Sequence, residues 1–308
     1  MFHASHGTHA MGGVKNSAYP GKPWPVSILS IQSLVAYGHA GNSAAVFPLQ
    51  RLGHEVWPVM TVHFSNHTGY GEWRGPVLPA EDVAEVVRGI EDRGVLPGCD
   101  AVLSGYQGAE QVGAVVLDAV ARVKAANPRA IYCCDPVMGD VGRGMFVRPG
   151  IPEFMRDEVV PAADVATPNH FELDFLTGTS SHTLPELLDA ARRLRAAGPS
   201  VVLVTSAVLV DTPGDSLDLV AVSADGAWRT RTPRLPISPN GGGDLTAAVF
   251  LAHLLDGRPV DDALARTTSA VFAVVAATHE AGDRELRIVQ TQDRIADPRL
   301  EFPAEQVG

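Results

Sequence analysis

Short apolar runs alternate with helically patterned segments along most of this chain, at the spacing of strand–helix–strand units. The runs are almost continuous in Val, Ile, Leu, Ala and Cys, which is typical of strands buried on both faces of a parallel sheet. We expect such strands at residues 26–31, 56–62, 101–104, 130–134, 164–167 and 201–204. The alternation therefore predicts an α/β fold with a mostly parallel central sheet and helices on both of its faces.

The helical segments carry apolar residues at helical spacing or have recognisable ends. We expect them at residues 43–52, 83–90, 112–127, 183–198, 245–255 and 259–279. One expected helical face is formed by Val83, Val86, Val87 and Ile90. Residues 217–222 and 227–231 flank Asp225-Gly226 and should form an antiparallel pair. We expect residues 25–308 to be a single domain, residues 1–24 to be a disordered leader, and residues 285–308 to be a polar, partly irregular tail.

Composition bounds the class of protein. The net charge is −11 and no basic stripe occurs, which argues against nucleic acid as a main partner. Cys99, Cys133 and Cys134 make a poor disulfide set, so we expect a reducing, cytoplasmic compartment. No apolar run approaches the roughly 18–20 residues of a membrane helix, so no membrane partner is expected. Histidines in the leader could bind a metal, but its composition favours disorder.

The segment with most chemical content is Gly241-Gly242-Gly243-Asp244, which leads into the helix expected from Leu245. Glycines allow backbone N–H groups to approach a ligand closely, and the first N–H groups of a helix have no internal partners. The three glycines therefore suit an anion-binding loop, for a phosphate or a developing negative charge. Asp244 beside that site suits a base that takes a proton from a hydroxyl attacking phosphorus. The alternative, common for short glycine motifs, is an acidic cap after a flexible turn.

Polar residues follow the ends of the expected strands. Each could be a turn residue or a cap, but together they line one edge of a parallel sheet, where ligands bind in such folds. Residues 139–144 should form a mobile loop, and Asn169 and Glu172 can face the same way at a helix start. The polar residues at strand ends are Ser33, on a loop over residues 32–42, Thr68, Tyr106, Asp135, Asn169 and Thr205.

Several motifs, in the right order, resemble the pyridoxal kinase family, and the glycine–aspartate element resembles the wider ribokinase-like superfamily. The resemblance covers residues 26–298 and includes a tail motif, residues 292–295, of the kind found in bacterial members. No Walker-type lysine motif occurs, so the chain is not a P-loop kinase. The segments that carry the resemblance are residues 31–45, 64–68, 103–106, 134–139 and 167–169.

This resemblance implies a ribokinase-like three-layer α/β/α sandwich and ATP-dependent phosphorylation of the 5′-hydroxymethyl group of pyridoxal, often also of pyridoxine and pyridoxamine. It implies a homodimer that uses ATP, Mg²⁺ and a monovalent cation such as K⁺. By position, Ser33 would hydrogen-bond the pyridine ring and Thr68 would contact its substituents. Three residues, Val62, Phe64 and Tyr106, would wall the ring.

The resemblance also implies roles on the nucleotide side. Gly241, Gly242 and Gly243 would form the anion hole and Asp244 would be the base. Asp135 and Glu172 would hold Mg²⁺. The residues implied near the ATP phosphates, the ion and its waters are Asp135, Asp140, Asn169, Glu172, Thr205 and Ser206.

Three positions depart from the family pattern. Gly242 stands where many relatives have Thr or Val, and Leu34 replaces a polar residue common in the bacterial branch. Asn240 is unusual before the glycines and is expected near the loop on the adenine side. Two alternatives stay open: a hydroxymethylpyrimidine kinase on the same fold, and a non-catalytic protein that binds the vitamer without turnover.

Overall fold

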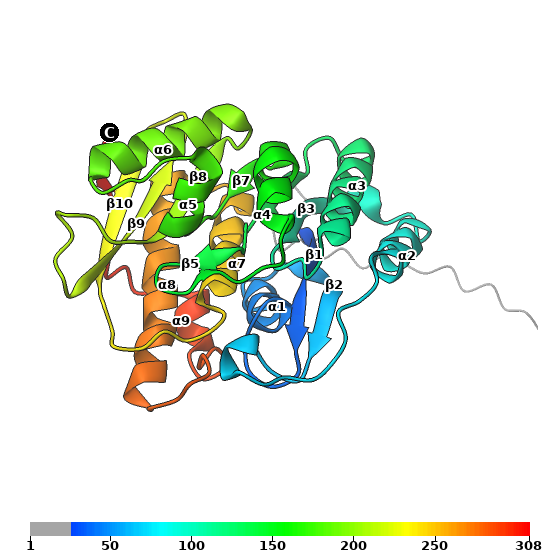
Figure 1. The fold of residues 1–308 in the computed structure, drawn as a ribbon, viewed down its shortest axis with the longest axis horizontal. Coiled ribbons are helices and arrows are strands. Elements are labelled where there is room, and N and C mark those ends of the chain that lie inside the picture. Colours follow the sequence, from blue (N-terminus) through cyan, green and yellow to red (C-terminus); the bar gives the residue numbers. More distant parts are fainter. Residues whose placement is uncertain (1–25) are drawn as a thin grey trace, which may run out of the picture.

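One nine-stranded sheet runs through the molecule (Figure 1). The computed structural model describes residues 26–308, so the leader predicted at residues 1–24 lies outside the described residues. Six neighbouring strands are mutually parallel: β8, β7, β4, β3, β1 and β2. The other three, β9, β10 and β11, are antiparallel to their neighbours. The strands, in spatial order, are β11 (Glu305–Gln306), β10 (Ala227–Pro233), β9 (Ser216–Val222), β8 (Val201–Ala207), β7 (Val165–Ala166), β4 (Ile131–Cys134), β3 (Cys99–Ser104), β1 (Ser27–Val35) and β2 (Glu55–Phe64).

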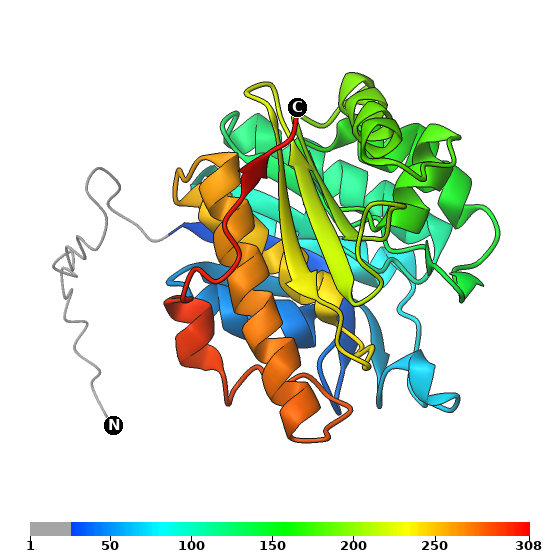
Figure 2. The same ribbon diagram turned by 90° about the vertical axis from the view of Figure 1, so that its left-hand side faces the viewer.

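Helices cover both faces of the sheet, so the prediction of a mostly parallel sheet between two helical layers is confirmed (Figures 1 and 2). One layer contains α1 (Asn42–Arg51), α7 (Gly242–Leu255), α8 (Val260–Glu280) and α9 (Gln292–Ala296). The other contains α2 (Ala80–Glu91), α3 (Glu110–Ala126), α4 (Ile151–Phe154), α5 (His170–Thr177) and α6 (Leu184–Ala197). In Figure 2 the long helix α8 crosses one side of β9 and β10, and α6 lies on the other.

The central strands bury alternate residues in two separate cores. In β4, Tyr132 and Cys134 pack against the layer of α3 and α5, whereas Cys133 packs against the layer of α1 and α7. In β8, Leu203 likewise packs in the core on the α1 and α7 side, whereas its neighbours Val202 and Val204 pack in the core on the other face. Because side chains alternate across a strand, a strand buried on both faces must be apolar at every position. This explains the continuous apolar runs in the sequence.

The prediction of a loop at residues 32–42 is wrong in its first part. Strand β1 continues to Val35, so Ser33 lies within a strand and not after it. The polar residues Ser30 and Gln32 are buried there and hydrogen-bond each other at 2.9 Å. Parallel pairing with β2 continues as far as Val35 and Phe64, which keeps the backbone extended.

Other boundaries also differ from the prediction. Helix α7 begins at Gly242, so two of the three glycines and Asp244 form its first turn and only Gly241 precedes it. Residues 139–144 are not a mobile loop but contain a small antiparallel hairpin of β5 (Gly139–Asp140) and β6 (Gly144–Met145). Thr205 and Ser206 lie inside β8, at an irregularity in its pairing with β9.

Two expectations about burial are corrected. Val86 is 50% exposed, although Val83 and Val87 of the same helix are buried. The tail after α8 is less irregular than predicted, because it buries Ile288 and Ile295 and adds β11 to the sheet. That continuous sheet supports the single domain predicted for residues 25–308, which stays a prediction.

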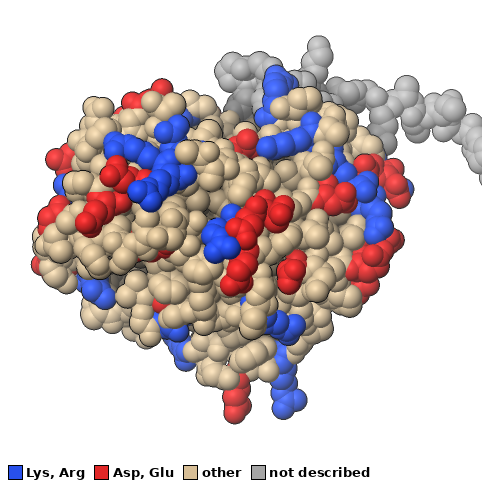
Figure 3. Space-filling view, turned by 45° about the horizontal axis from the view of Figure 1, so that its top comes forward, with Lys and Arg blue, Asp and Glu red and all other residues tan. Residues whose placement is uncertain are grey.

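The three cysteines are free and buried. Burial raises the pKa of each thiol, most strongly for Cys133. Within residues 26–308 no helix has the length and apolarity needed to cross a bilayer. Acidic and basic side chains are interspersed on the face drawn in Figure 3, where no continuous basic area appears.

Candidate active site

The strand order reverses between β1 and β3, because the chain first adds β2 on one side of β1 and then β3 on the other. In open α/β sheets, ligands bind outside the carboxyl ends of the strands at such a reversal. Ser33 of β1 and Tyr106, which follows β3, lie at this edge. The polar strand ends predicted from the sequence therefore do share one edge of the sheet.

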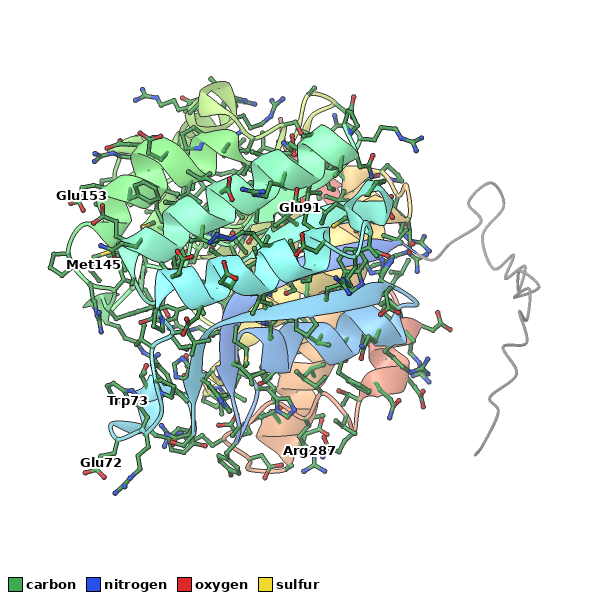
Figure 4. The ribbon with its side chains drawn as sticks, turned by 90° about the vertical axis from the view of Figure 1, so that its right-hand side faces the viewer. Glu72, Trp73, Glu91, Met145, Glu153 and Arg287 are labelled. Atoms are coloured by element: carbon green, nitrogen blue, oxygen red, sulfur yellow. The ribbon has the colours of Figure 1, made fainter. Side chains whose placement is uncertain are left out.

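An apolar wall stands at the ends of β1 and β2. It combines three residues predicted to wall a ring, Val62, Phe64 and Tyr106, with Val35 and Ala40. The ring of Trp73 covers Phe64 at a centroid distance of 6.1 Å. Figure 4 shows Trp73 and Met145, from hairpin β5–β6, on the same side of the molecule.

Thr68 begins a short 3₁₀ helix, η1 (Thr68–Tyr70), next to this wall. The side chain of His67 caps η1 by accepting a hydrogen bond from the N–H of Gly69 at 2.9 Å. Asn240 packs against Gly69. Asn240 therefore lies beside η1, and its expected proximity to the loop on the adenine side stays a prediction.

Helix α7 begins without a side-chain cap, because its N-cap residue is Gly241. Gly241 precedes the helix in the left-handed conformation, with φ of 84°. A Cβ atom there would overlap the carbonyl oxygen of His39, so the close approach of these two loops requires glycine. An uncapped helix start with a positive dipole end suits an anion.

Asp244 lies in the first turn of α7, between the apolar wall and the other acidic residues. Burial raises its pKa, whereas the backbone N–H of Gly41 stabilises the ionised form and opposes that rise. Gly41 in turn packs directly against Ser33. A carboxylate in this position can reach a ligand that is bound against Ser33 and also an anion at the start of α7.

Asp135, at the end of β4, is the most constrained acid of the site. It is 4% exposed, and its Oδ1 accepts a hydrogen bond from the hydroxyl of Thr167 at 3.2 Å. Its Oδ2 is buried, has no hydrogen-bond partner and faces the backbone of Gly243. Burial raises the pKa of Asp135 well above its ordinary value, and the nearby carboxyls of Glu172 and Asp244 raise it further. A buried carboxylate oxygen without a protein partner suits a bound cation.

Asn169 and Glu172 form a capping box at the start of α5. The Asn169 side chain accepts from the N–H of Glu172, and Glu172 Oε2 accepts from the N–H of Asn169, both at 2.9 Å. Glu172 Oε1 also accepts from the N–H of Met138 at 2.9 Å, which fixes hairpin β5–β6 to the helix. Burial raises the pKa of Glu172 to about 7, against these backbone donors, and Asp140 adds to the rise.

The remaining predicted residues surround this group. Asp140 belongs to the hairpin and accepts a hydrogen bond from the N–H of Val141 at 2.7 Å. Thr205 forms a bridge with Asn169. Ser206 is exposed and is the one non-glycine residue with a positive φ, 54°, in the described part of the chain. Strained backbone of this kind is found at ligand sites more often than elsewhere.

Arg284 and Glu285 also reach this end of the molecule, and the sequence analysis did not identify them. The carboxylate of Glu285 bonds to Tyr70 of η1 and to His39, which are 215 and 246 residues away in sequence. No local pattern signals contacts of such long range.

Comparison with known proteins gives a consistent result. A family model described as phosphomethylpyrimidine kinase matches residues 95–288. A protein of Rubrobacter xylanophilus named "Pyridoxal kinase PdxY" is 58% identical over 92% of this chain and 98% of its own length. One of the same name from Leifsonia xyli is 56% identical over 92% of this chain and all of its own length. The structure of "Pyridoxal Kinase from Leishmania donovani in complex with ADP and Pyridoxine" superimposes with a TM-score of 0.84 at 30% identity, covering 92% of this chain and 99% of that one.

Proposed function

This chain belongs to the pyridoxal kinase family, with its ribokinase-like fold, and we propose that it transfers the γ-phosphoryl group of ATP to the 5′-hydroxyl of pyridoxal. The products are pyridoxal 5′-phosphate and ADP, as expected of an enzyme of vitamin B6 salvage. The observation that carries the proposal is the position of Asp244, in an uncapped helix start between an apolar wall and the buried Asp135.

The apolar wall is the proposed site of the pyridine ring. The apolar surface comes from Val62, Phe64 and Tyr106. Ser33 supplies a hydroxyl near the C-terminal end of β1. Thr68 on η1 is the proposed contact to the ring substituents. Pyridoxine and pyridoxamine share the ring and the 5′-hydroxyl, so we propose them as further substrates.

Asp244 is the proposed general base. As the 5′-oxygen forms its bond to the γ-phosphorus and the bond from that phosphorus to the bridging oxygen of ADP breaks, the hydroxyl proton passes to the carboxylate. The N–H groups of Gly241, Gly242 and Gly243 would stabilise the negative charge on the transferring group. The raised pKa of Asp244 makes it a better proton acceptor than an ordinary aspartate.

The neighbouring carboxyls of Asp135 and Glu172 fit a magnesium ion. Mg²⁺ prefers oxygen ligands and commonly binds through one or two carboxylates together with substrate phosphates and waters. Asp135 offers the unpartnered oxygen and Glu172 is the second proposed ligand. When bound, Mg²⁺ would neutralise charge on the ATP phosphates.

Asp140, Asn169, Thr205 and Ser206 are proposed to line the nucleotide phosphates and the waters of the ion. The capping box supports this, because it fixes Asn169 and the hairpin of Asp140 relative to each other. A monovalent cation such as K⁺ and a homodimer are proposed from the family resemblance alone. A cytoplasmic location is proposed from the three free cysteines, which suit a reducing compartment. Sedimentation at micromolar concentration tests the dimer.

A coupled assay of ADP release, run in parallel with pyridoxal, pyridoxine, pyridoxamine and hydroxymethylpyrimidine, tests the proposed function. We expect the largest kcat/KM with pyridoxal. A preference for hydroxymethylpyrimidine would favour the second candidate, which the description of the matching family model supports. Pyridoxal binding without ADP release would instead indicate the non-catalytic vitamer-binding protein.

A further inference from the structure

The segment that follows α8 reaches the loops of the proposed pyridoxal side. Glu285 Oε1 accepts a hydrogen bond from the Tyr70 hydroxyl at 2.7 Å, and Oε2 accepts one from the N–H of His39 at 2.9 Å. Arg284 donates to the carbonyl oxygen of Gly69 at 2.6 Å, and its guanidinium lies 3.6 Å from the centre of the Tyr70 ring. Figure 4 shows Arg287, two residues after Glu285, at the same end of the molecule as Glu72, which lies just beyond η1.

These contacts hold two different loops to one carboxylate. The first loop is η1, which begins with Thr68. The second is the turn after β1, where Gly38, with φ of 88°, comes so close to Glu285 that a Cβ atom would overlap the carboxylate. The next residue, His39, packs its carbonyl oxygen on Gly241, so the turn also touches the start of α7.

We infer that Arg284 and Glu285 are positioning residues that hold η1 and the turn at residues 36–41 in place for pyridoxal, an inference that rests on the proposed function. Hydrogen bonds to a carboxylate and a cation over an aromatic ring are stronger than neutral contacts. Loops tied down in this way need less ordering when a ligand binds, which improves affinity. Both residues contact η1 and this turn directly, and they reach the start of α7 only through His39, so the effect should fall mainly on the vitamer.

Glu285→Gln is the first test, because Gln keeps the shape but presents a single acceptor oxygen. We expect KM for pyridoxal to rise about threefold to tenfold, whereas KM for ATP changes by less than about twofold. Glu285→Asp, which keeps the charge on a shorter side chain, should recover part of the loss. Asp293→Asn is the matched control: it breaks an ion pair of 2.8 Å with Arg51 in the same tail, away from both loops, and should leave both KM values unchanged.

A double variant tests whether Glu285 acts through the loop. Tyr70→Phe removes the hydroxyl that Glu285 accepts from and keeps the ring. If Glu285 acts through Tyr70, the effects of Tyr70→Phe and Glu285→Gln on KM for pyridoxal will be smaller together than the product of the two. Fully multiplicative effects would contradict that route. Tyr70→Phe also serves as the test variant if Glu285→Gln does not fold.

Hydrogen–deuterium exchange of the ligand-free protein gives a readout that does not need activity. In Glu285→Gln we expect faster exchange at residues 36–41 and 66–71, and unchanged exchange at residues 139–145. A variant with a lower Tm but unchanged loop exchange and KM would show a merely stabilising link and overturn the inference. If the wild-type protein does not phosphorylate pyridoxal, the proposed function fails, and the exchange result still decides whether the pair holds the loops.

Discussion

Helices α5 and α7 both begin at the ligand-binding edge of the sheet, and both carry an acid at the third position of the helix. In α5 that acid is Glu172, which closes the capping box with Asn169. In α7 it is Asp244, and the N-cap residue of this helix, Gly241, has no side chain with which a capping box could form. The first helix start is completed by a capping box, whereas the second has no side chain at its N-cap position.

The difference separates a helix start with a complete capping box from one that has no side-chain cap. Glu172 accepts hydrogen bonds from the N–H groups of Asn169 and Met138, and so joins the start of α5 to hairpin β5–β6. Asp244 is one methylene shorter, follows a residue without a side chain, and lies near Gly41 on the neighbouring loop. Two acids at the same helical position thus take different roles because of the residue three places before them.

Asp244→Asn is the strongest test of this contrast. Asn keeps the shape but cannot take the proton from the attacking hydroxyl, so we expect kcat to fall at least about a hundredfold. ATP and pyridoxal should still bind measurably, as seen by calorimetry. If Asp244 were only an acidic residue at a helix start, the variant would keep more than about a tenth of the wild-type kcat.

Gly241→Ala should have the next largest effect, because it alters the uncapped helix start itself. The positive φ and the overlap with the His39 carbonyl oxygen would force the loop to move. A misplacement of about 1 Å can lower a rate about a hundredfold, so we expect kcat to fall by about tenfold to a hundredfold. Tm should fall as well. Unchanged steady-state kinetics would mean that the position of this loop is not critical.

Glu172→Gln tests the helix start that is already complete. The folded protein holds a proton on Glu172 up to pH about 7, whereas in the unfolded chain the group releases it near its ordinary pKa of 4.5. Ionised Glu172 is therefore disfavoured by folding, and its contribution to stability falls as pH rises between these values. In metal-free buffer, the Tm of the variant should improve relative to the wild type across that pH range. If the plots of Tm against pH for the variant and the wild type were parallel, they would contradict the raised pKa of Glu172.

Gly242→Ala should have the smallest effect and serves as the partner of Gly241→Ala. A Cβ atom at Gly242 would meet no atom within 4 Å, and no positive φ is required there. Replacing a helical glycine by Ala typically stabilises by about 0.5–1 kcal/mol. We expect a slightly higher Tm in calorimetry and kcat within about twofold of the wild type. A large loss of kcat would mean that this position needs glycine for the ligand.

The sequence predicted the central strands, the main helices and the antiparallel pair of β9 and β10, because each has a period that shows locally. It failed where tertiary contacts override local pattern. Ser33 sits in β1 because pairing with β2 continues past the apolar run. The glycine-rich residues 139–144 form a hairpin because Glu172 holds the N–H of Met138. The site residues came mainly from the family resemblance, and Glu285 was missed because its partners are more than 200 residues away.

Strand β11 has a consequence for handling the protein. Its two residues pair with Trp228 and Arg229 of β10, and the carbonyl oxygen of Gly308 accepts a hydrogen bond from Ala227. An uncovered strand at the side of a sheet is a template on which other molecules can aggregate. Trimming residues 304–308 would uncover β10 in this way, so affinity tags and deletions at that end carry a risk to solubility.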